Sequence, residues 1–261
     1  MRVLSAAALT VALFAPGQAR AQTQQSAPVH TCTVSLDAVR LANSLTHVAH
    51  RLITGEPITI VAIGSSSTAG AGASSPALSY PSRLLVELGE IFPRQKFTVI
   101  NRGVNGEEAA DMLKRFDAQV VAEKPDLVLW QLGTNSVIRD HVTTDQGATI
   151  RDGVNTLKLA GADVVLIDPQ FAPKVIVKPE VEHVVDMISV TAKAENVGLF
   201  HRFSLMRRWY HDERMTFEEF VSPDGLHMND WSYGCLAKTL AAAIAEAATR
   251  PVASASAAPR R

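Results

Sequence analysis

Runs of apolar residues alternate with amphipathic segments along most of this chain. Ile58 to Ile63 is apolar without polar alternation, which is typical of a central strand in a parallel sheet covered on both faces. Shorter apolar runs predict further strands at 97–100, 127–132, 163–167 and 197–200. Apolar residues at helical spacing predict helices at 34–53, 80–92, 107–121 (allowing one break), 149–159, 181–196 and 202–220, and a last helix from about Trp231. This alternation predicts right-handed crossovers and a three-layer α/β/α sandwich around a parallel sheet of about five strands.

The two ends of the chain differ in composition from the middle. Arg2 precedes an almost continuous apolar run, and Ala19-Arg20-Ala21 fits a small-x-small cleavage site. We therefore expect residues 1–21 to be a signal peptide for export to the periplasm or the medium, with an apolar run too short to span a membrane. Residues 22–250 suit a single domain with the helix at 34–53 packed on it, and residues 251–261 have the composition of a disordered tail.

Composition narrows the classes of function. A hydrophobic content of 47% supports a substantial core, while a net charge of -1 without a long basic block argues against nucleic acid and against an electrostatic membrane anchor. Cys32 and Cys235 lack the spacing of a zinc site, and in an exported protein such a pair predicts a disulfide, with two free thiols as the alternative. His47 and His50 are spaced as metal ligands can be, but are interpreted as part of a solvated helix face.

Three predicted strands end in small polar turns: Gly64-Ser65-Ser66, Gly103-Val104-Asn105 and Gly133-Thr134-Asn135. The first turn alone could be an ordinary serine-rich helix cap. Because parallel strands end at one edge of a sheet, however, the three turns should meet in one cleft. Far downstream, Asp224 precedes His227 by three residues, so one short loop could present an oriented imidazole. Together these residues provide a hydroxyl nucleophile, a base, a carboxylate and oxyanion donors, the components of acyl transfer.

These blocks resemble the four signature blocks of the SGNH hydrolases, also called the GDSL esterase/lipase family. They occur in the family's order and span residues 58 to 229. The resemblance implies a catalytic triad and an oxyanion hole, whose donors are two backbone N–H groups and one side-chain amide. By position in the blocks, the triad is Ser66, Asp224 and His227, and the oxyanion donors are Ser66, Gly103 and Asn135.

One residue departs from the family pattern. Ser65 stands where the family has the Asp of its Gly-Asp-Ser turn. That Asp is not the triad carboxylate, so the chemistry should survive while the bracing of the turn changes. Ser65 and Ser67 are neighbouring hydroxyls, but only Ser66 keeps the register of the family. The G-x-S-x-G elbow of α/β-hydrolases is absent, because the position two residues after Ser66 is Thr68.

The resemblance implies a serine esterase that needs no metal or cofactor. Its substrates would be carboxylic esters such as acetylated glycans, lipid esters or acyl thioesters. Export, and the lack of an apolar run that could form a lipid lid, favour small acyl groups on carbohydrate. Two alternatives stay open: an acyltransferase with the same triad, and a non-catalytic glycan-binding member of the fold. The aromatic segment 202–220 either contacts sugar through Trp209 or Tyr210, or packs as an amphipathic helix.

Overall fold

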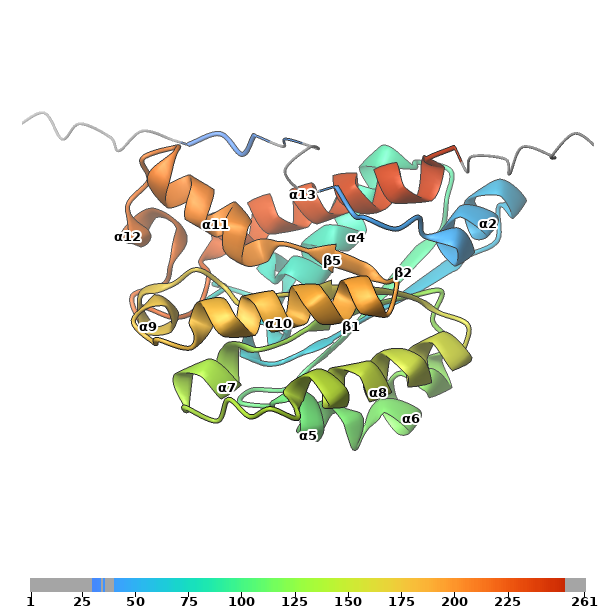
Figure 1. Ribbon diagram of the computed structural model, residues 1–261. Helices are drawn as coiled ribbons and strands as arrows, with labels where there is room; N and C mark the ends of the chain where they lie inside the picture. The colour runs from blue at the N-terminus through green and yellow to red at the C-terminus, as the bar shows by residue number, and fades with distance from the viewer. Residues whose placement is uncertain (1–29, 34, 36–39, 252–261) are drawn as a thin grey trace, which may run out of the picture. The chain divides into compact units, whose positions relative to one another are not determined.

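Five parallel strands form the centre of the structure, a computed structural model that describes residues 30–33, 35 and 40–251 (Figure 1). The strands are β1 Ile58–Gly64, β2 Phe97–Gly103, β3 Leu127–Gln131, β4 Asp163–Ile167 and β5 Gly198–Phe200. Their order across the sheet is β2-β1-β3-β4-β5, and every neighbouring pair is parallel. The strand order therefore reverses between β1 and β3, the place where open α/β sheets bind ligands.

Helices cover both faces of this sheet, which confirms the predicted α/β/α sandwich. They are α2 Thr46–Thr54, α3 Ser66–Ala69, α4 Tyr80–Ile91, α5 Ala109–Leu113, α6 Phe116–Gln119, α7 Thr134–Ile138, α8 Gln146–Leu159, α9 Pro173–Ile176, α10 Val181–Ala194, α11 Arg202–His211, α12 Phe217–Phe220 and α13 Asp230–Thr249. Figure 1 shows α4 and α13 side by side above the sheet, with α5, α6 and α8 below it. None of the described helices is long and apolar enough to cross a membrane.

The central strands are buried because helices cover them on both sides. Every residue of β3 is buried, and β1 is buried except for Thr59. Trp130 of β3 packs edge-on against Phe116, and its indole N–H donates to Met112 Sδ. A Cβ on Gly153 of α8 would lie 2.3 Å from the Trp130 ring, so the glycine lets the helix approach the sheet closely. The apolar runs thus become strands held rigidly between two helical layers.

The helix predicted at 34–53 is shorter in the structure. It starts at Thr46, residues 40–45 are not helical, and 34 and 36–39 lie outside the described residues. Leu41 and Leu45 match the apolar spacing of a helix, but the structure buries them in non-helical chain. The start of α2 is fixed by Asp163, whose carboxylate accepts hydrogen bonds from the N–H groups of residues 47 and 48 at 2.9 and 3.0 Å. Desolvation raises the pKa of this carboxyl, against the effect of those hydrogen bonds.

Two other predicted helices are each divided in two. The segment 107–121 forms α5 and α6, and the segment 202–220 forms α11 and α12. In the second case the chain turns through Arg214, which has a φ of 59°, and Thr216 then caps α12 in a capping box with Glu219. Cys32 and Cys235 are both disulfide-bonded, as predicted. The predicted signal peptide at 1–21 and all but the first residue of the tail at 251–261 lie outside the described residues.

Candidate active site

Ser66, His227 and Asp224 form one hydrogen-bonded chain at the carboxyl edge of the sheet. Ser66 is the first residue of α3, and Ser65 alone separates it from the end of β1. His227 Nε2 lies 2.8 Å from Ser66 Oγ, and His227 Nδ1 lies 2.5 Å from Asp224 Oδ2. Because an ionised carboxylate only accepts hydrogen bonds, Nδ1 carries the proton and Nε2 is left to accept the Ser66 hydroxyl. The ring is therefore oriented as a base toward Ser66.

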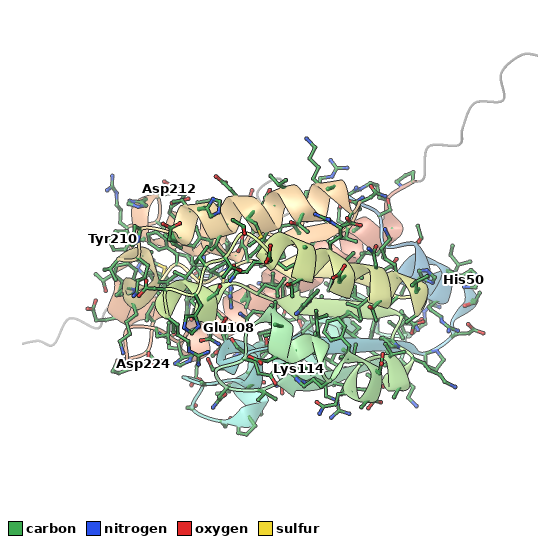
Figure 2. The ribbon with its side chains drawn as sticks, turned by 60° about the horizontal axis from the view of Figure 1, so that its bottom comes forward. His50, Glu108, Lys114, Tyr210, Asp212 and Asp224 are labelled. Carbon is green, nitrogen blue, oxygen red and sulfur yellow. The ribbon has the colours of Figure 1, made fainter. Side chains whose placement is uncertain are left out.

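Asp224 also organises the loop that carries the histidine. Its Oδ1 accepts the N–H groups of Leu226 and His227, each at 2.9 Å. Burial raises the pKa of Asp224, but the hydrogen bonds from the His227 ring and from these N–H groups outweigh it and leave the pKa below its ordinary value. The carboxylate thus stays ionised beside the imidazole. Figure 2 places Asp224 and Tyr210 toward one end of the molecule and His50 of α2 toward the other.

Close packing presses the Asp224–His227 loop against the chain that follows Ser66. A Cβ on Gly72 would lie 2.3 Å from the carbonyl oxygen of Met228 and 2.8 Å from His227 Cβ. The Tyr233 hydroxyl donates to the carbonyl of Ala71 at 2.6 Å. Ser74 donates through both its N–H and its hydroxyl to the Asp230 carboxylate. No motif in the sequence indicated these contacts, yet they set the distance between the base and the nucleophile.

The turn before Ser66 is braced by Gln131 at the end of β3. Gln131 Oε1 accepts the N–H and the hydroxyl of Ser65 at 2.9 and 3.0 Å. It also lies within 3.1 Å of Ser67 Oγ and 3.3 Å of Thr68 Oγ1, two further donors. Ser65 itself is buried. The amide oxygen of a neighbouring strand therefore gathers the hydrogen bonds of this turn, in which Ser65 replaces the Asp of the SGNH pattern.

The structure does not support Gly103 as an oxyanion donor, and this prediction needs correction. Gly103 ends β2, the edge strand of the sheet, and its N–H donates to Asn101 Oδ1 at 2.9 Å. The next N–H, of Val104, points back to β1 and donates to the Gly64 carbonyl. Gly103 serves packing instead, because a Cβ there would lie 2.1 Å from the backbone nitrogen of Ala69 in α3. Asn101 joins the same two elements by donating to the Thr68 carbonyl at 2.8 Å.

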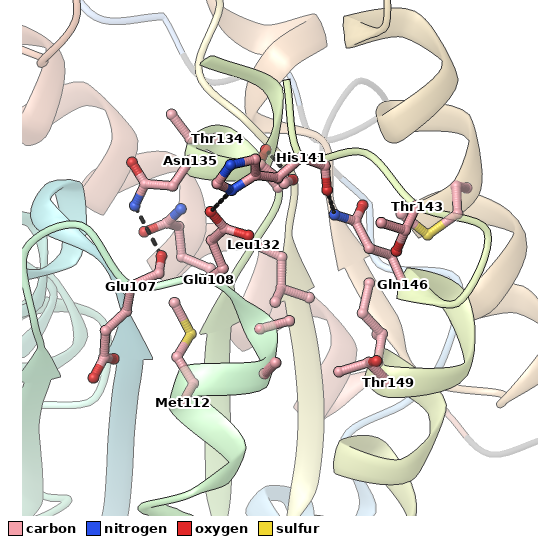
Figure 3. A pocket seen from close by; sticks show the side chains of 17 residues that line it. Glu107, Glu108, Met112, Leu132, Thr134, Asn135, His141, Thr143, Gln146 and Thr149 are labelled. Atoms are coloured by element: carbon pink, nitrogen blue, oxygen red, sulfur yellow. Dashed lines mark hydrogen bonds and ion pairs between the residues drawn. The ribbon is translucent and has the colours of Figure 1, made fainter. Parts of the chain in front are cut away.

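Gly106 is the second glycine of this loop. It has a φ of 81°, in the left-handed region that glycine tolerates, and no hydrogen bond among the described residues uses its N–H. Its neighbour Glu107 accepts the Asn135 side-chain amide at 2.8 Å through its carbonyl (Figure 3). Asn135 lies in α7 and is buried. The structure thus brings the 103–107 loop against Asn135.

A cavity of about 230 Å³ opens beside Asn135 (Figure 3). Met112, Leu132 and Ile150 line its apolar part, and His141 lies at its polar side, within 3.1 Å of a Glu108 oxygen. Neither Ser66 nor His227 lines it. The cavity therefore adjoins the predicted site through Asn135 but does not contain the hydroxyl and the imidazole.

The aromatic segment after β5 is mostly core. Trp209 is buried and packs edge-on against Phe220 and Trp231, so its ring is not open to a ligand. Tyr210 is 38% exposed, but one face of its ring stacks on Phe217 with centroids 4.5 Å apart. The packing interpretation of this segment therefore holds for Trp209. No group of three or more metal-binding side chains is found in the part of the chain that the structure describes.

Comparisons with known proteins agree with this fold. A stretch of 94 residues is 30% identical to the acetylxylan esterase of Geobacillus stearothermophilus, over 32% of this chain and 43% of that protein. The chain thus spans less than half the length of this curated relative. Among solved structures, a two-domain esterase active on acetylated mannans, CEX, superposes with a TM-score of 0.71 at 22% identity, over 86% of this chain and 59% of that one. Axe2, an acetylxylan esterase from G. stearothermophilus, superposes with a TM-score of 0.60 at 20% identity, over 72% of this chain and 94% of that one.

At these identities the two structures bear on the fold alone. The profile of the Non-GDSL lipase-like family, in contrast, matches residues 31–250, most of the chain. A family described as non-GDSL also fits the serine that this chain has at position 65. The predicted SGNH resemblance is confirmed: the chain belongs to the Non-GDSL lipase-like family and has the fold of an SGNH-type hydrolase.

Proposed function

We propose that this protein is a serine esterase that releases small acyl groups from carbohydrate esters. The observation that carries the proposal is the chain from Ser66 Oγ through the His227 ring to Asp224, with contacts of 2.8 and 2.5 Å. A hydroxyl, an oriented imidazole and a carboxylate in hydrogen-bond contact are the components of nucleophilic acyl transfer. The curated relative described as an acetylxylan esterase supports carbohydrate as the substrate class.

In the first half of the reaction, His227 Nε2 takes the Ser66 proton while Ser66 Oγ attacks the ester carbonyl. The Asp224 carboxylate stabilises the imidazolium that forms, without taking a proton itself. The imidazolium then protonates the sugar oxygen that leaves, and an acyl-serine remains. In the second half, His227 takes a proton from water, the hydroxide attacks the acyl-serine, and the proton returns to Ser66 as the carboxylic acid departs.

The carbonyl oxygen becomes negatively charged in both halves and needs donors. We assign this role to the Ser66 N–H, the Asn135 amide and the Gly106 N–H, in place of Gly103. Ser66 is the first residue of α3, so its N–H has no partner within that helix, and no hydrogen bond among the described residues uses it. The Asn135 amide has two N–H bonds, of which Glu107 takes one. Donors that are fixed in place before the reaction are worth the most to the transition state.

Export fits this proposal. A disulfide between the two cysteines is typical of proteins that mature in an oxidising compartment. We therefore propose that residues 1–21 direct the chain out of the cytoplasm and that the protein binds its substrate outside the cytoplasm.

The test measures acetate released from acetylated xylan and acetylated mannan, beside a series of p-nitrophenyl esters of increasing chain length. We expect acetate release by the purified protein, a preference for the shortest esters, and loss of turnover in Ser66→Ala by about 10⁴-fold or more. An added sugar acceptor that captures the acyl group in preference to water would identify an acyltransferase instead. Binding of the polysaccharides without any ester cleavage would identify a glycan-binding protein and refute the proposal.

A further inference from the structure

The largest charged side chain of the core lies next to the serine turn. Arg202 is the first residue of α11 and is fully buried. Burial lowers its pKa to about 10, against the attraction of Asp168, so the guanidinium remains a cation at neutral pH. Burying a cation is unfavourable unless hydrogen bonds and opposite charge compensate for it. The contacts of the Arg202 guanidinium therefore indicate its role.

Two of the guanidinium nitrogens have defined partners. Nε donates to the backbone carbonyl of Asp168 at 2.9 Å, and Nη1 donates to Ser67 Oγ at 2.9 Å. The Asp168 carboxylate, also fully buried, accepts the Phe203 N–H at 2.7 Å and so caps the start of α11. This hydrogen bond does not involve the Arg202 side chain. The bond to Ser67 is thus the contact by which the guanidinium reaches the nucleophile turn.

An arginine only donates hydrogen bonds, which fixes the direction of the chain that starts from it. Ser67 must accept from Arg202, and its single proton is then directed to Gln131 Oε1 at 3.1 Å. The same oxygen accepts both donors of Ser65. The residues on either side of Ser66 are therefore tied to one atom, and the guanidinium prevents Ser67 from turning its proton elsewhere.

We propose that Arg202 is a positioning residue for the Ser66 nucleophile, acting through Ser67 and Gln131. It keeps the Ser65–Ser67 turn in the one arrangement that points Ser66 Oγ at His227. This inference rests on the proposed function of Ser66 as nucleophile. It predicts that the loss of the guanidinium acts on the reaction step of the folded enzyme, beyond any effect on stability.

The experiment compares Ser67→Ala, Arg202→Lys, Arg202→Met and the double variant Ser67→Ala/Arg202→Met. Arg207→Met is the matched control, because Arg207 lies on the same helix but is exposed, and among the described residues it pairs with Glu182 and the Phe203 ring, away from the serine turn. For each variant we measure kcat and KM on p-nitrophenyl acetate, the second-order rate of labelling by a fluorophosphonate, and the melting temperature. Rates are expressed per folded molecule.

Ser67→Ala and Arg202→Met should lower kcat and the labelling rate by the same factor, about 10- to 100-fold, since a displacement near 1 Å costs up to about 10²-fold. KM should change little. The kcat and the labelling rate of Arg202→Lys should lie between those of wild type and Arg202→Met, and those of Arg207→Met should equal the wild-type values. The double variant should be no slower than the slower single variant, because both changes break one chain. If Arg202→Met does not fold, Ser67→Ala and Arg202→Lys decide the question.

Wild-type labelling rates in folded Ser67→Ala and Arg202→Lys, with only a lower melting temperature, would refute the positioning role. Effects that multiply in the double variant would refute it as well. If the wild-type protein itself is not labelled on Ser66, the proposed function fails and this inference fails with it. If the wild type is labelled on Ser66 and the variants are labelled at the same rate, only the inference about Arg202 is refuted.

Discussion

A methyl group on Gly103 is expected to move the helix that carries the nucleophile. The added Cβ would lie 2.1 Å from the Ala69 nitrogen, 2.6 Å from the Thr68 carbonyl carbon and 2.7 Å from the Ala69 Cα, whereas ordinary contacts start at 3.4 Å. These are backbone atoms of α3, so no side chain can swing aside to relieve the clash. Strand β2 and α3 would have to separate by about 1.3 Å.

This separation gives Gly103→Ala two measurable effects. The strain should cost about 1–3 kcal/mol of unfolding free energy, the usual range for overpacking. Because Ser66 moves with α3, kcat on p-nitrophenyl acetate should fall by about 10²-fold, the effect of a displacement near 1 Å. Urea unfolding and steady-state kinetics measure the two quantities.

Gly89→Ala is the control, since Gly89 lies in α4 and a Cβ there meets nothing within 4 Å. That variant should keep full activity and gain up to about 1 kcal/mol from the better helix propensity of alanine. A Gly103→Ala variant with wild-type kcat and wild-type stability would refute the packing role that we assign to this glycine.

Three further predictions follow from the site. Asn135→Ala should lower kcat by about 10²–10³-fold with little change in KM, because the amide acts on the oxyanion; a rise in KM alone would make Asn135 a binding residue. The pKa of Asp224 is held below its ordinary value, so its contribution to stability is present above about pH 4 and is lost as the pH falls through the folded-state pKa. The difference in melting temperature between wild type and Asp224→Asn should therefore shrink as the pH falls from 6 to 3, and a constant difference would contradict this. The double variant Cys32→Ser/Cys235→Ser opens a loop of about 200 residues, which the chain-entropy model values at up to about 5 kcal/mol of unfolding free energy; equal unfolding midpoints with and without the disulfide would show that it does not stabilise the fold.

The sheet could be predicted from sequence because its central strands carry their own signal. Ile58 to Ile63 is apolar at every position but Thr59, and only a strand covered on both faces needs that pattern. The start of α2 could not be predicted, because its cap is Asp163, 116 residues away from His47 in the chain. Leu41 and Leu45 imitate helical spacing while packing as irregular chain. Local patterns thus identified the elements but not the tertiary contacts that end them.

In the site, too, local patterns predicted some features and long-range contacts decided the others. The strand pattern placed Ser66 at the carboxyl edge of the sheet, whereas its grouping with Asp224 and His227 came from the resemblance to the SGNH blocks. The role of Gly103 could not be predicted, because the direction of an N–H in an edge strand depends on the register of its pairing. Here the register directs the Val104 N–H to the Gly64 carbonyl of β1. The Asn105-Gly106 pair, typical of turns with positive φ, was the signal that could have identified the better glycine. Nothing local in the sequence links Arg202 to Ser67, because 135 residues separate them.

Covalent trapping of the nucleophile tests the central claim most directly. A fluorophosphonate reacts with an activated serine, and the tryptic peptide 52–83 carries Ser65, Ser66 and Ser67 together, so fragment masses assign the adduct to one of them. We predict one adduct per molecule, on Ser66, and none in Ser66→Ala, whose ester turnover is lost as well. An adduct on Ser65 or Ser67, or ester turnover that persists in Ser66→Ala, would contradict the account.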